Sequence, residues 1–377
     1  MQTKRFGLCA ALSAAALLLL AGCAGSGSTA APTLTVESSY PLQYAKQFTV
    51  DECTGGYELI TIADSQYLVV PQGAAVPEDL PQGTTVLQQP IENIYLVSTS
   101  AMDPIISLGA LDSIALSGTK ADGWYLPEAK AAMQAGKIAY AGKYSAPDYE
   151  TILASGCGLA IENTMIYHTP EVKEQLEKFG IPVLVERSSY ETDPLARMEW
   201  VKLYGILLGK KQEAEQLFDT QVQRVAPLEN QQPTGKTVAF FSITSNNLVT
   251  VRKGSDYVAR MIEMAGGSYV FDDLTDSGNN LATINLSLED FYAGAKDADV
   301  LLYNSTIEGS IASTEQLVEK CPLLAQFKAV QNGNVWCTAQ SLFQQSMELP
   351  DLILDMNRVF TEGTPADSEL TFLTHVE

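Results

Sequence analysis

Residues 205–215 read Gly-Ile-Leu-Leu-Gly-Lys-Lys-Gln-Glu-Ala-Glu and join two helical segments near the middle of the chain. The first segment opens at Asp193 and Pro194, because an acidic cap followed by proline in the first turn is typical of a helix start. Helical character continues through Leu207, is interrupted near Gly209 and resumes at Lys210. We therefore predict a connecting helix over residues 209–234, which separates two similar halves of the chain.

Both halves alternate short apolar runs with segments of helical period, a pattern typical of βα units on a mostly parallel sheet. The predicted fold class is therefore α/β, with two Rossmann-like lobes joined by one long, rigid helix. The N-terminal lobe covers residues 36–208, the C-terminal lobe covers residues 235–365, and residues 366–377 form a tail. The predicted strands are residues 94–97, 113–116, 158–161, 182–185, 237–243, 299–303 and 334–337, and the predicted helices lie near residues 102–109, 125–135, 147–155, 170–179, 255–265, 287–295, 313–328 and 340–361.

The start of the N-terminal lobe has a different pattern. Residues 48–70 alternate like an edge hairpin, and Gly55 and Gly56 are the expected turn. Parallel sheets bind ligands beyond the carboxyl ends of their strands, so two such lobes would share a ligand site in the crevice between them. Because a helical connector is stiffer than an extended hinge, we expect only a modest closure around a ligand.

The composition excludes several classes of function. The 377 residues include 45 acidic and 23 basic residues, which gives a formal net charge of −22, and no basic patch would attract nucleic acid. Only two histidines occur, His168 and His375, which excludes a three-histidine zinc site and the HExxH motif. An exported α/β hydrolase is an alternative from a different class, but the GxSxG motif is absent.

The N-terminus has the features of a processing segment. Lys4 and Arg5 precede an apolar run that is too short for a comfortable membrane helix. Leu20-Ala21-Gly22-Cys23 resembles a bacterial lipobox, so residues 1–22 are predicted to be a lipoprotein signal peptide and residues 23–35 a flexible tether. Cys23 would then carry the lipid that anchors the protein at the extracytoplasmic face of the cell membrane. An ordinary signal peptide with an incidental cysteine is the alternative.

Four cysteines follow the predicted anchor, and none of them has the CxxC spacing of a metal knuckle or a redox motif. Export permits a disulfide, for which Cys321 and Cys337 are the nearest pair in the sequence. Buried free thiols are an equally good interpretation.

Four segments together resemble the bacterial ABC-transporter substrate-binding proteins for iron-siderophore, heme and cobalamin. Residues 205–215 resemble that family's GxLLGKxxEAE segment. Three further segments follow the family's order, namely Leu-Gly-Ala-Leu-Asp-Ser-Ile at 108–114, Met-Ala-Gly-Gly with Tyr-Val-Phe at 264–271, and Phe-Lys-Ala-Val-Gln-Asn-Gly-Asn-Val-Trp at 327–336. The resemblance extends from about residue 90 to residue 360.

The resemblance implies a monomeric binding protein with the class III periplasmic-binding fold, with no catalysis and no covalently required cofactor. Its partners would be an ABC permease, the permease's ATPase and a small-molecule metal chelate. An iron(III)-siderophore is the favoured cargo, and cobalamin (or another corrinoid) and heme are the alternatives. A structural or adhesive lipoprotein of the same fold is a further alternative.

Two glutamates occupy equivalent places in the two lobes. Glu150 and Glu289 each lie in the first turn of a predicted helix, where the helix dipole alone favours an acidic residue by about 0.3–1 kcal/mol. In the resembling family, a glutamate at each of these places binds arginines of the permease. The resemblance therefore assigns permease docking to Glu150 and Glu289.

Aromatic, cationic and polar side chains in loops after strands are the candidates for ligand contact. Arginines would pair with anionic chelate oxygens, and aromatic rings would cover a flat or apolar ligand. For each aromatic residue, the alternative to ligand contact is burial in the core. For Arg197, the alternative is packing on the protein surface. No residue is predicted to ligate a metal, because His168 fits a hydrogen-bonded surface position better than an axial ligand of heme. The predicted ligand contacts are Ser100, Trp124, Tyr125, Tyr167, Tyr190, Arg197, Arg252, Tyr303 and Trp336.

Overall fold

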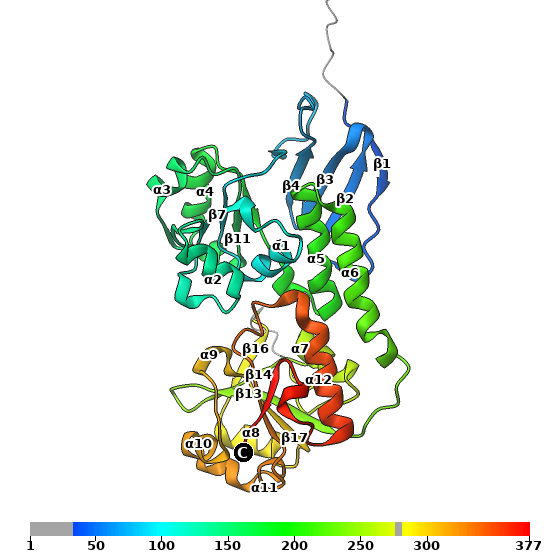
Figure 1. The fold of residues 1–377 in the computed structure, drawn as a ribbon, viewed down its shortest axis with the longest axis vertical. Coiled ribbons are helices and arrows are strands. Elements are labelled where there is room, and N and C mark those ends of the chain that lie inside the picture. The colour runs from blue at the N-terminus through cyan, green and yellow to red at the C-terminus, as the bar shows by residue number, and fades with distance from the viewer. Residues whose placement is uncertain (1–32, 276–280) are drawn as a thin grey trace, which may run out of the picture.

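The computed structural model describes residues 33–275 and 281–377, which form two α/β lobes and an additional N-terminal sheet (Figure 1). In this part of the chain no helix has both the length and the apolarity needed to cross a membrane. The predicted signal peptide, Cys23 and nearly all of the tether lie outside the described residues.

The N-terminal lobe contains the predicted parallel sheet. Its five strands have the order β12-β11-β6-β7-β8, and every neighbouring pair is parallel. Strands such as Ile94–Leu96 are buried on both faces, which explains why they appear in the sequence as continuous apolar runs. The strands are β6 (Ile94–Leu96), β7 (Ile114–Ser117), β8 (Ala139–Tyr140), β11 (Ala160–Glu162) and β12 (Val183–Val185), beside a small hairpin of β9 (Gly142–Lys143) and β10 (Ala146–Pro147), and the helices are α1 (Met102–Ser107), α2 (Pro127–Gln134), α3 (Tyr149–Ala154) and α4 (Pro170–Lys178).

The C-terminal lobe has a mixed sheet. Strands β13, β17 and β18 are parallel, as predicted, but antiparallel strands extend the sheet on both sides. The strands are β13 (Thr237–Ile243), β14 (Val249–Arg252), β15 (Ser268–Tyr269), β16 (Thr283–Leu286), β17 (Val300–Tyr303), β18 (Val335–Thr338) and β19 (Leu373–His375), and the helices are α7 (Tyr257–Met264), α8 (Leu288–Ala295), α9 (Ser305–Glu308), α10 (Thr314–Lys320), α11 (Lys328–Gln331) and α12 (Leu349–Glu362).

Three expected boundaries in the C-terminal lobe differ from the structure. The predicted tail contains β19, which pairs with β18 and therefore belongs to the lobe. The predicted helix 313–328 ends at Lys320, because Pro322 lacks an N–H donor and disfavours the helical conformation of the residue before it. The last helix begins only at Leu349, and residues 339–348 form a loop and a short 3-10 turn.

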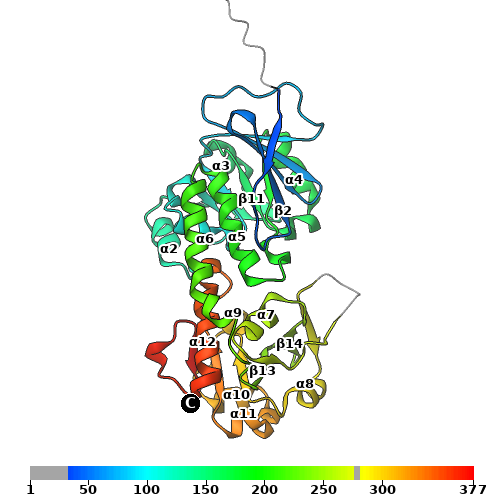
Figure 2. The same cartoon turned by 90° about the vertical axis from the view of Figure 1, so that its right-hand side faces the viewer.

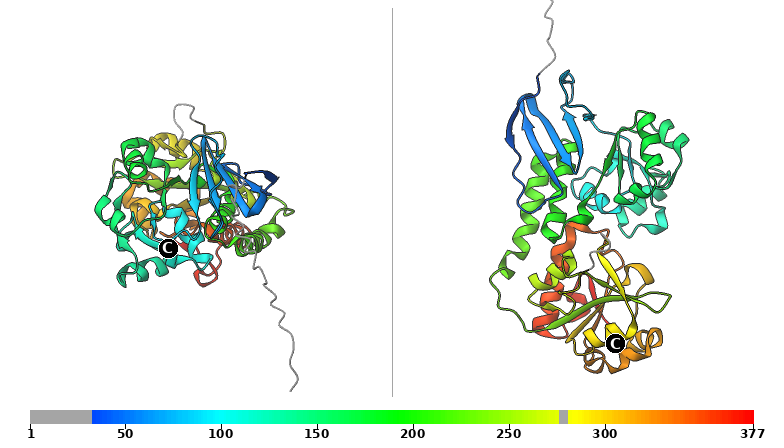
Figure 3. Two further views of the ribbon diagram at one scale, coloured as in Figure 1. Left: turned by 90° about the horizontal axis from the view of Figure 1, so that it is seen from above. Right: turned by 180° about the vertical axis from the view of Figure 1, so that it is seen from behind.

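The stretch that was predicted to be an edge hairpin belongs instead to a separate sheet. The turn is as expected, since Gly55 and Gly56 both have a φ of +81°. However, strands β1 (Val36–Ser39), β2 (Phe48–Cys53), β3 (Tyr57–Ile62), β4 (Ser65–Val70) and β5 (Thr85–Gln88) pair with one another and with no strand of the lobe. Figure 3 shows this N-terminal sheet beside the two helices that follow the N-terminal lobe.

Those two helices, α5 (Pro194–Leu207) and α6 (Lys211–Val225), pack side by side (Figure 2). Between them Gly209 has a φ of +68°, a left-handed conformation that glycine adopts without strain. The connecting helix is therefore shorter than the predicted 209–234, and a 3-10 turn and a loop complete the link. Helix α12 joins the same interface, where Arg224 of α6 forms an ion pair with Asp351.

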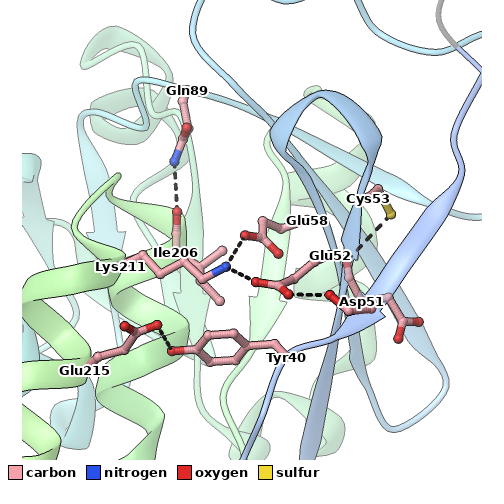
Figure 4. A network of polar contacts seen from close by, with 10 residues as sticks. Tyr40, Asp51, Glu52, Cys53, Glu58, Gln89, Ile206, Lys211 and Glu215 are labelled. Atoms are coloured by element: carbon pink, nitrogen blue, oxygen red, sulfur yellow. Dashed lines mark hydrogen bonds and ion pairs between the residues drawn. The ribbon is translucent and has the colours of Figure 1, made fainter.

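Contacts made by residues 205–215 hold the N-terminal sheet and helices α5 and α6 together. A Cβ atom on Gly205 would lie 2.4 Å from the Cβ of Ala214, so α5 and α6 approach each other closely at this glycine. Lys211 Nζ lies 2.6 Å from Oε1 of both Glu52 and Glu58, and Glu215 accepts a hydrogen bond of 2.8 Å from Tyr40 (Figure 4). These contacts fix the N-terminal sheet to the helix pair.

Gly205→Ala is expected to destabilise the protein by about 1–3 kcal/mol, because the added methyl group would overlap Ala214 and the carbonyl oxygen of Lys210, 2.8 Å away. Chemical denaturation checks this value. Helix propensity alone predicts the opposite effect, an increase in the free energy of unfolding of up to about 1 kcal/mol, because alanine favours a helix more than glycine does. A more stable variant would therefore contradict the close packing of α5 and α6.

Candidate ligand-binding cleft

A cavity of about 430 Å³ lies between the two lobes. The N-terminal lobe contributes the loop that follows β12, and the C-terminal lobe contributes residues after β14. A cation stands on each side, Arg187 on one wall and Lys253 on the other. The described residues that line it are Arg187, Ser189, Tyr190, Glu191, Thr192, Lys253, Ser255, Asp256, Thr275, Leu281 and Ala282.

A buried carboxylate shapes the N-terminal wall. Glu186 follows β12 directly and is 2% exposed. It accepts hydrogen bonds from the hydroxyl groups of Ser98 and Ser100 and from the backbone N–H of Ser188, at 2.7–3.1 Å. The predicted contact Ser100 is therefore half-buried and holds the loop after β12 in place.

Arg187 lies at the cavity surface and is held from two sides. Its guanidinium carbon is 4.5 Å from the ring centroid of Tyr190, the predicted contact that also lines the cavity. Its Nε and Nη2 atoms donate to Oε1 of Gln47, both at 3.3 Å. Gln47 lies 140 residues earlier in the chain, so no local pattern in the sequence indicates this contact.

Arg197, which was predicted to contact the ligand, is buried between the two lobes. Its side chain is 8% exposed, and Nη1 donates to the carbonyl oxygen of Ser188 at 3.0 Å. The guanidinium also lies 4.1 Å from the ring centroid of Tyr257, on helix α7 of the other lobe. Burial raises the pKa of Tyr257, while Arg197 and Arg252 act against this shift. Arg197 is thus packed between the lobes and is not among the residues that line the cavity.

Arg252 is the second predicted cation and lies beside the cavity. Its guanidinium carbon is 4.6 Å from the ring centroid of Phe343, and Nη1 is 3.7 Å from a carboxylate oxygen of Asp256, a lining residue. Arg187, Arg252 and Lys253 bring positive charge to this cleft, and the carboxylates of Glu191 and Asp256 line the same cavity.

Three predicted aromatic contacts are in the core instead. Trp124 is 1% exposed and donates to the hydroxyl of Ser117, while Tyr303 and Trp336 are fully buried. Burial raises the pKa of Tyr303 to about 12. These positions correct the expectation of ligand contact, because all three large rings are packed into the hydrophobic core and do not reach the cavity.

The two remaining aromatic candidates are exposed. Tyr125 is 43% exposed at the boundary between the lobes, where its backbone N–H donates to Gln344 at 2.7 Å. Tyr167 is 50% exposed on the turn after β11 and does not line the described cavity. His168, also on this turn, is exposed as expected.

The loop of residues 339–348 adds direct contacts between the lobes. Ser346 donates to the carbonyl oxygen of Ser100, and the backbone N–H of Met347 donates to Asp103 at 2.7 Å. Burial raises the pKa of Asp103 to about 6. No local pattern in the sequence could reveal these contacts, because the partners are more than 240 residues apart.

The predicted docking glutamates are exposed in the first turns of helices. Glu150 lies in α3, which Asp148 caps by accepting the N–H of Thr151, and Glu289 lies in α8. The two helices belong to different lobes (Figure 2). Cys321 and Cys337 are buried free thiols, and among the described residues no group of acidic, cysteine or histidine side chains could hold a metal ion.

Two α/β lobes that face each other across a polar cleft, with packed helices between them, define a two-lobed solute-binding protein. The chain belongs to the periplasmic binding protein family, whose sequence model matches residues 96–341. This family consists of solute-binding proteins, not enzymes, which removes the hydrolase alternative.

Similar proteins agree with this assignment. An uncharacterised lipoprotein of Methanocaldococcus jannaschii is 28% identical over 241 residues, which are 62% of this chain and 55% of that protein. The chain spans about half the length of the curated relatives it matches. The periplasmic heme-binding protein HutB of Vibrio cholerae has the same fold, with a TM-score of 0.57 and 18% identity over 73% of this chain and 99% of its own. A structure from an Fe³⁺-hydroxamate transport system of Saccharomonospora viridis has a TM-score of 0.55 and 22% identity over 72% of this chain and 94% of its own.

Proposed function

We propose that this protein is a lipid-anchored receptor that captures a metal chelate, with an iron(III)-siderophore as the favoured cargo, outside the cytoplasmic membrane and delivers it to an ABC permease and its ATPase. The observation that carries this proposal is the polar cleft between the lobes, where Arg187 and Lys253 face the cavity and the guanidinium of Arg187 stacks on Tyr190. A homologue named as a lipoprotein supports the anchor, and structural neighbours named for heme and Fe³⁺-hydroxamate support the class of cargo.

The charges around the cleft favour an anionic chelate. Arg187 and Lys253 line the cavity, and Arg252 lies beside it. The two carboxylates that also line the cavity are engaged by the protein, since Glu191 accepts the backbone N–H groups of residues 46 and 47 and Asp256 pairs with Arg252. Guanidinium groups bind carboxylate or catecholate oxygens through charged, often bidentate hydrogen bonds. The ring of Tyr190 stacks on the guanidinium of Arg187 and also lines the cavity, so an aromatic side chain is available to the same ligand.

Cobalamin or another corrinoid, and heme, are the alternative cargoes. Heme would use the same cations through its carboxylates. The exposed position of His168 outside the described cavity argues against its use as an axial ligand. Calorimetric titration with hemin, cyanocobalamin, an anionic iron(III) tris-catecholate and a neutral iron(III) tris-hydroxamate compares these classes directly. Binding of none of them would contradict the proposed function.

Replacement of Arg187 or Arg252 by alanine is expected to weaken the binding of the iron(III) tris-catecholate by about 1.5–3 kcal/mol each, because each change removes a charged hydrogen-bond donor. Isothermal titration calorimetry measures the change. Arg358→Ala is the matched control, since this arginine lies near the C-terminal end of α12 and pairs with Glu362 of that helix and with Glu369 of the following 3-10 turn. Unchanged affinity in both cleft variants would place the anion elsewhere.

A further inference from the structure

Residues 40–47, between β1 and β2 of the N-terminal sheet, form a strap that reaches Arg187 at the cleft. Two buried carboxylates hold its backbone, one from the loop after β12 and one from helix α5. Glu199, fully buried, accepts the N–H groups of residues 43, 44 and 45, and Glu191, 4% exposed, accepts those of residues 46 and 47, all at 2.7–3.1 Å. The strap is thus fixed through its main chain, whichever side chains it carries.

From this fixed strap, the side chain of Gln47 extends to Arg187 at the cavity surface. Its Oε1 atom accepts from Nε and Nη2 of the guanidinium, while Tyr190 supports the flat face of the same group. Because Gln47 occupies the edge formed by Nε and Nη2, the second edge of the guanidinium remains for a bidentate ligand.

We propose that Gln47 is a positioning residue that holds Arg187 ready for an anionic ligand and so sets the preference of the cleft for anionic over neutral chelates. This inference rests on the proposed function. Arginine has a flexible side chain, and ordering it before the ligand arrives lowers the entropic cost of binding. The strap precedes residue 96, where the match to the family begins, so this device belongs to the added N-terminal sheet.

The test uses Gln47→Met, which keeps the length of the side chain and removes the acceptor oxygen. The backbone N–H of residue 47 can still donate to Glu191, so the strap is expected to stay in place and the thermal unfolding midpoint to change little. Affinity for the anionic iron(III) tris-catecholate is expected to fall about three- to tenfold, the size of the ordering cost of one long side chain. Affinity for the neutral iron(III) tris-hydroxamate, if it binds, should not change.

A double-mutant cycle shows whether Gln47 acts through Arg187. In an Arg187→Met background, Gln47→Met should cause no further loss of affinity for the tris-catecholate. Gln43→Met is the matched control, because Gln43 lies on the same strap and its backbone is held by Glu199 rather than Glu191. It should bind both chelates as the unmodified protein does.

Three results would overturn the inference. The first is an unchanged affinity of Gln47→Met for the tris-catecholate, and the second is an equal loss for both chelates, which would indicate a merely structural role. The third is a full additional loss in the Arg187→Met background. If the unmodified protein binds the neutral tris-hydroxamate more tightly than the anionic tris-catecholate, or binds neither, the anionic cargo itself is wrong and the inference fails with it, a result that the unmodified protein alone reveals.

Discussion

Reversal of charge at both docking glutamates, Glu150→Lys/Glu289→Lys, is expected to abolish uptake of the cargo and to leave its affinity unchanged. Both side chains are exposed in first turns of helices, one in each lobe, and neither lines the described cavity between the lobes. If each meets an arginine of the permease, breaking a desolvated pair costs about 2–5 kcal/mol, and two such losses exceed what the remaining contacts supply. The single variants should retain partial transport, because the other lobe keeps its contact.

Two measurements are needed together, titration of the purified protein with the cargo and transport into vesicles that contain the permease and its ATPase. Glu213→Lys/Glu315→Lys is the matched control, since these exposed glutamates also lie in first helical turns, in α6 and α10, and the change in charge is the same. The control should transport normally. Full transport by the Glu150/Glu289 variant would refute the docking assignment, and lost affinity would move these carboxylates into the ligand site.

Cys23→Ala is expected to move nearly all of the protein from the membrane fraction to the soluble fraction. The reason is that a lipidated cysteine would be the attachment point, and no helix among the described residues can cross a membrane. Residues 24–31 are rich in glycine, serine, alanine and threonine, so loss of the anchor should leave the lobes folded. Fractionation of cells followed by immunodetection measures the distribution, and circular dichroism of the released protein confirms its fold.

Cys157→Ala is the control for this experiment, because Cys157 is a partly exposed free thiol of the N-terminal lobe. It should remain in the membrane fraction and incorporate labelled fatty acid as the unmodified protein does. Retention of Cys23→Ala in the membrane fraction would show that the lipobox interpretation is wrong.

Much of the fold could be predicted because its signals are local. The apolar runs at 94–97 and 237–243 became central strands, and the proline and capping residues near Pro194 marked the start of α5. The separate N-terminal sheet could not be predicted, since alternation shows that a strand exists but not which strand it pairs with. The site was harder still. The predicted contact Tyr190 lines the cleft, whereas the predicted contact Tyr303, at the end of β17, is buried.

The sequence by itself therefore determined the class of fold, the alternation of the central strands and main helices in the two lobes, and the family. These properties depend on spacing between neighbours along the chain, such as the glycines and charged residues of 205–215. Only the tertiary structure decided which side chains face the cleft. Whether Trp124 or Arg187 reaches a ligand depends on the residues packed around it, and the partner of Arg187 lies 140 residues away, on the strap between β1 and β2. Packing between distant segments leaves no periodic signal in the sequence, because either partner could be replaced without changing the local pattern of its own segment.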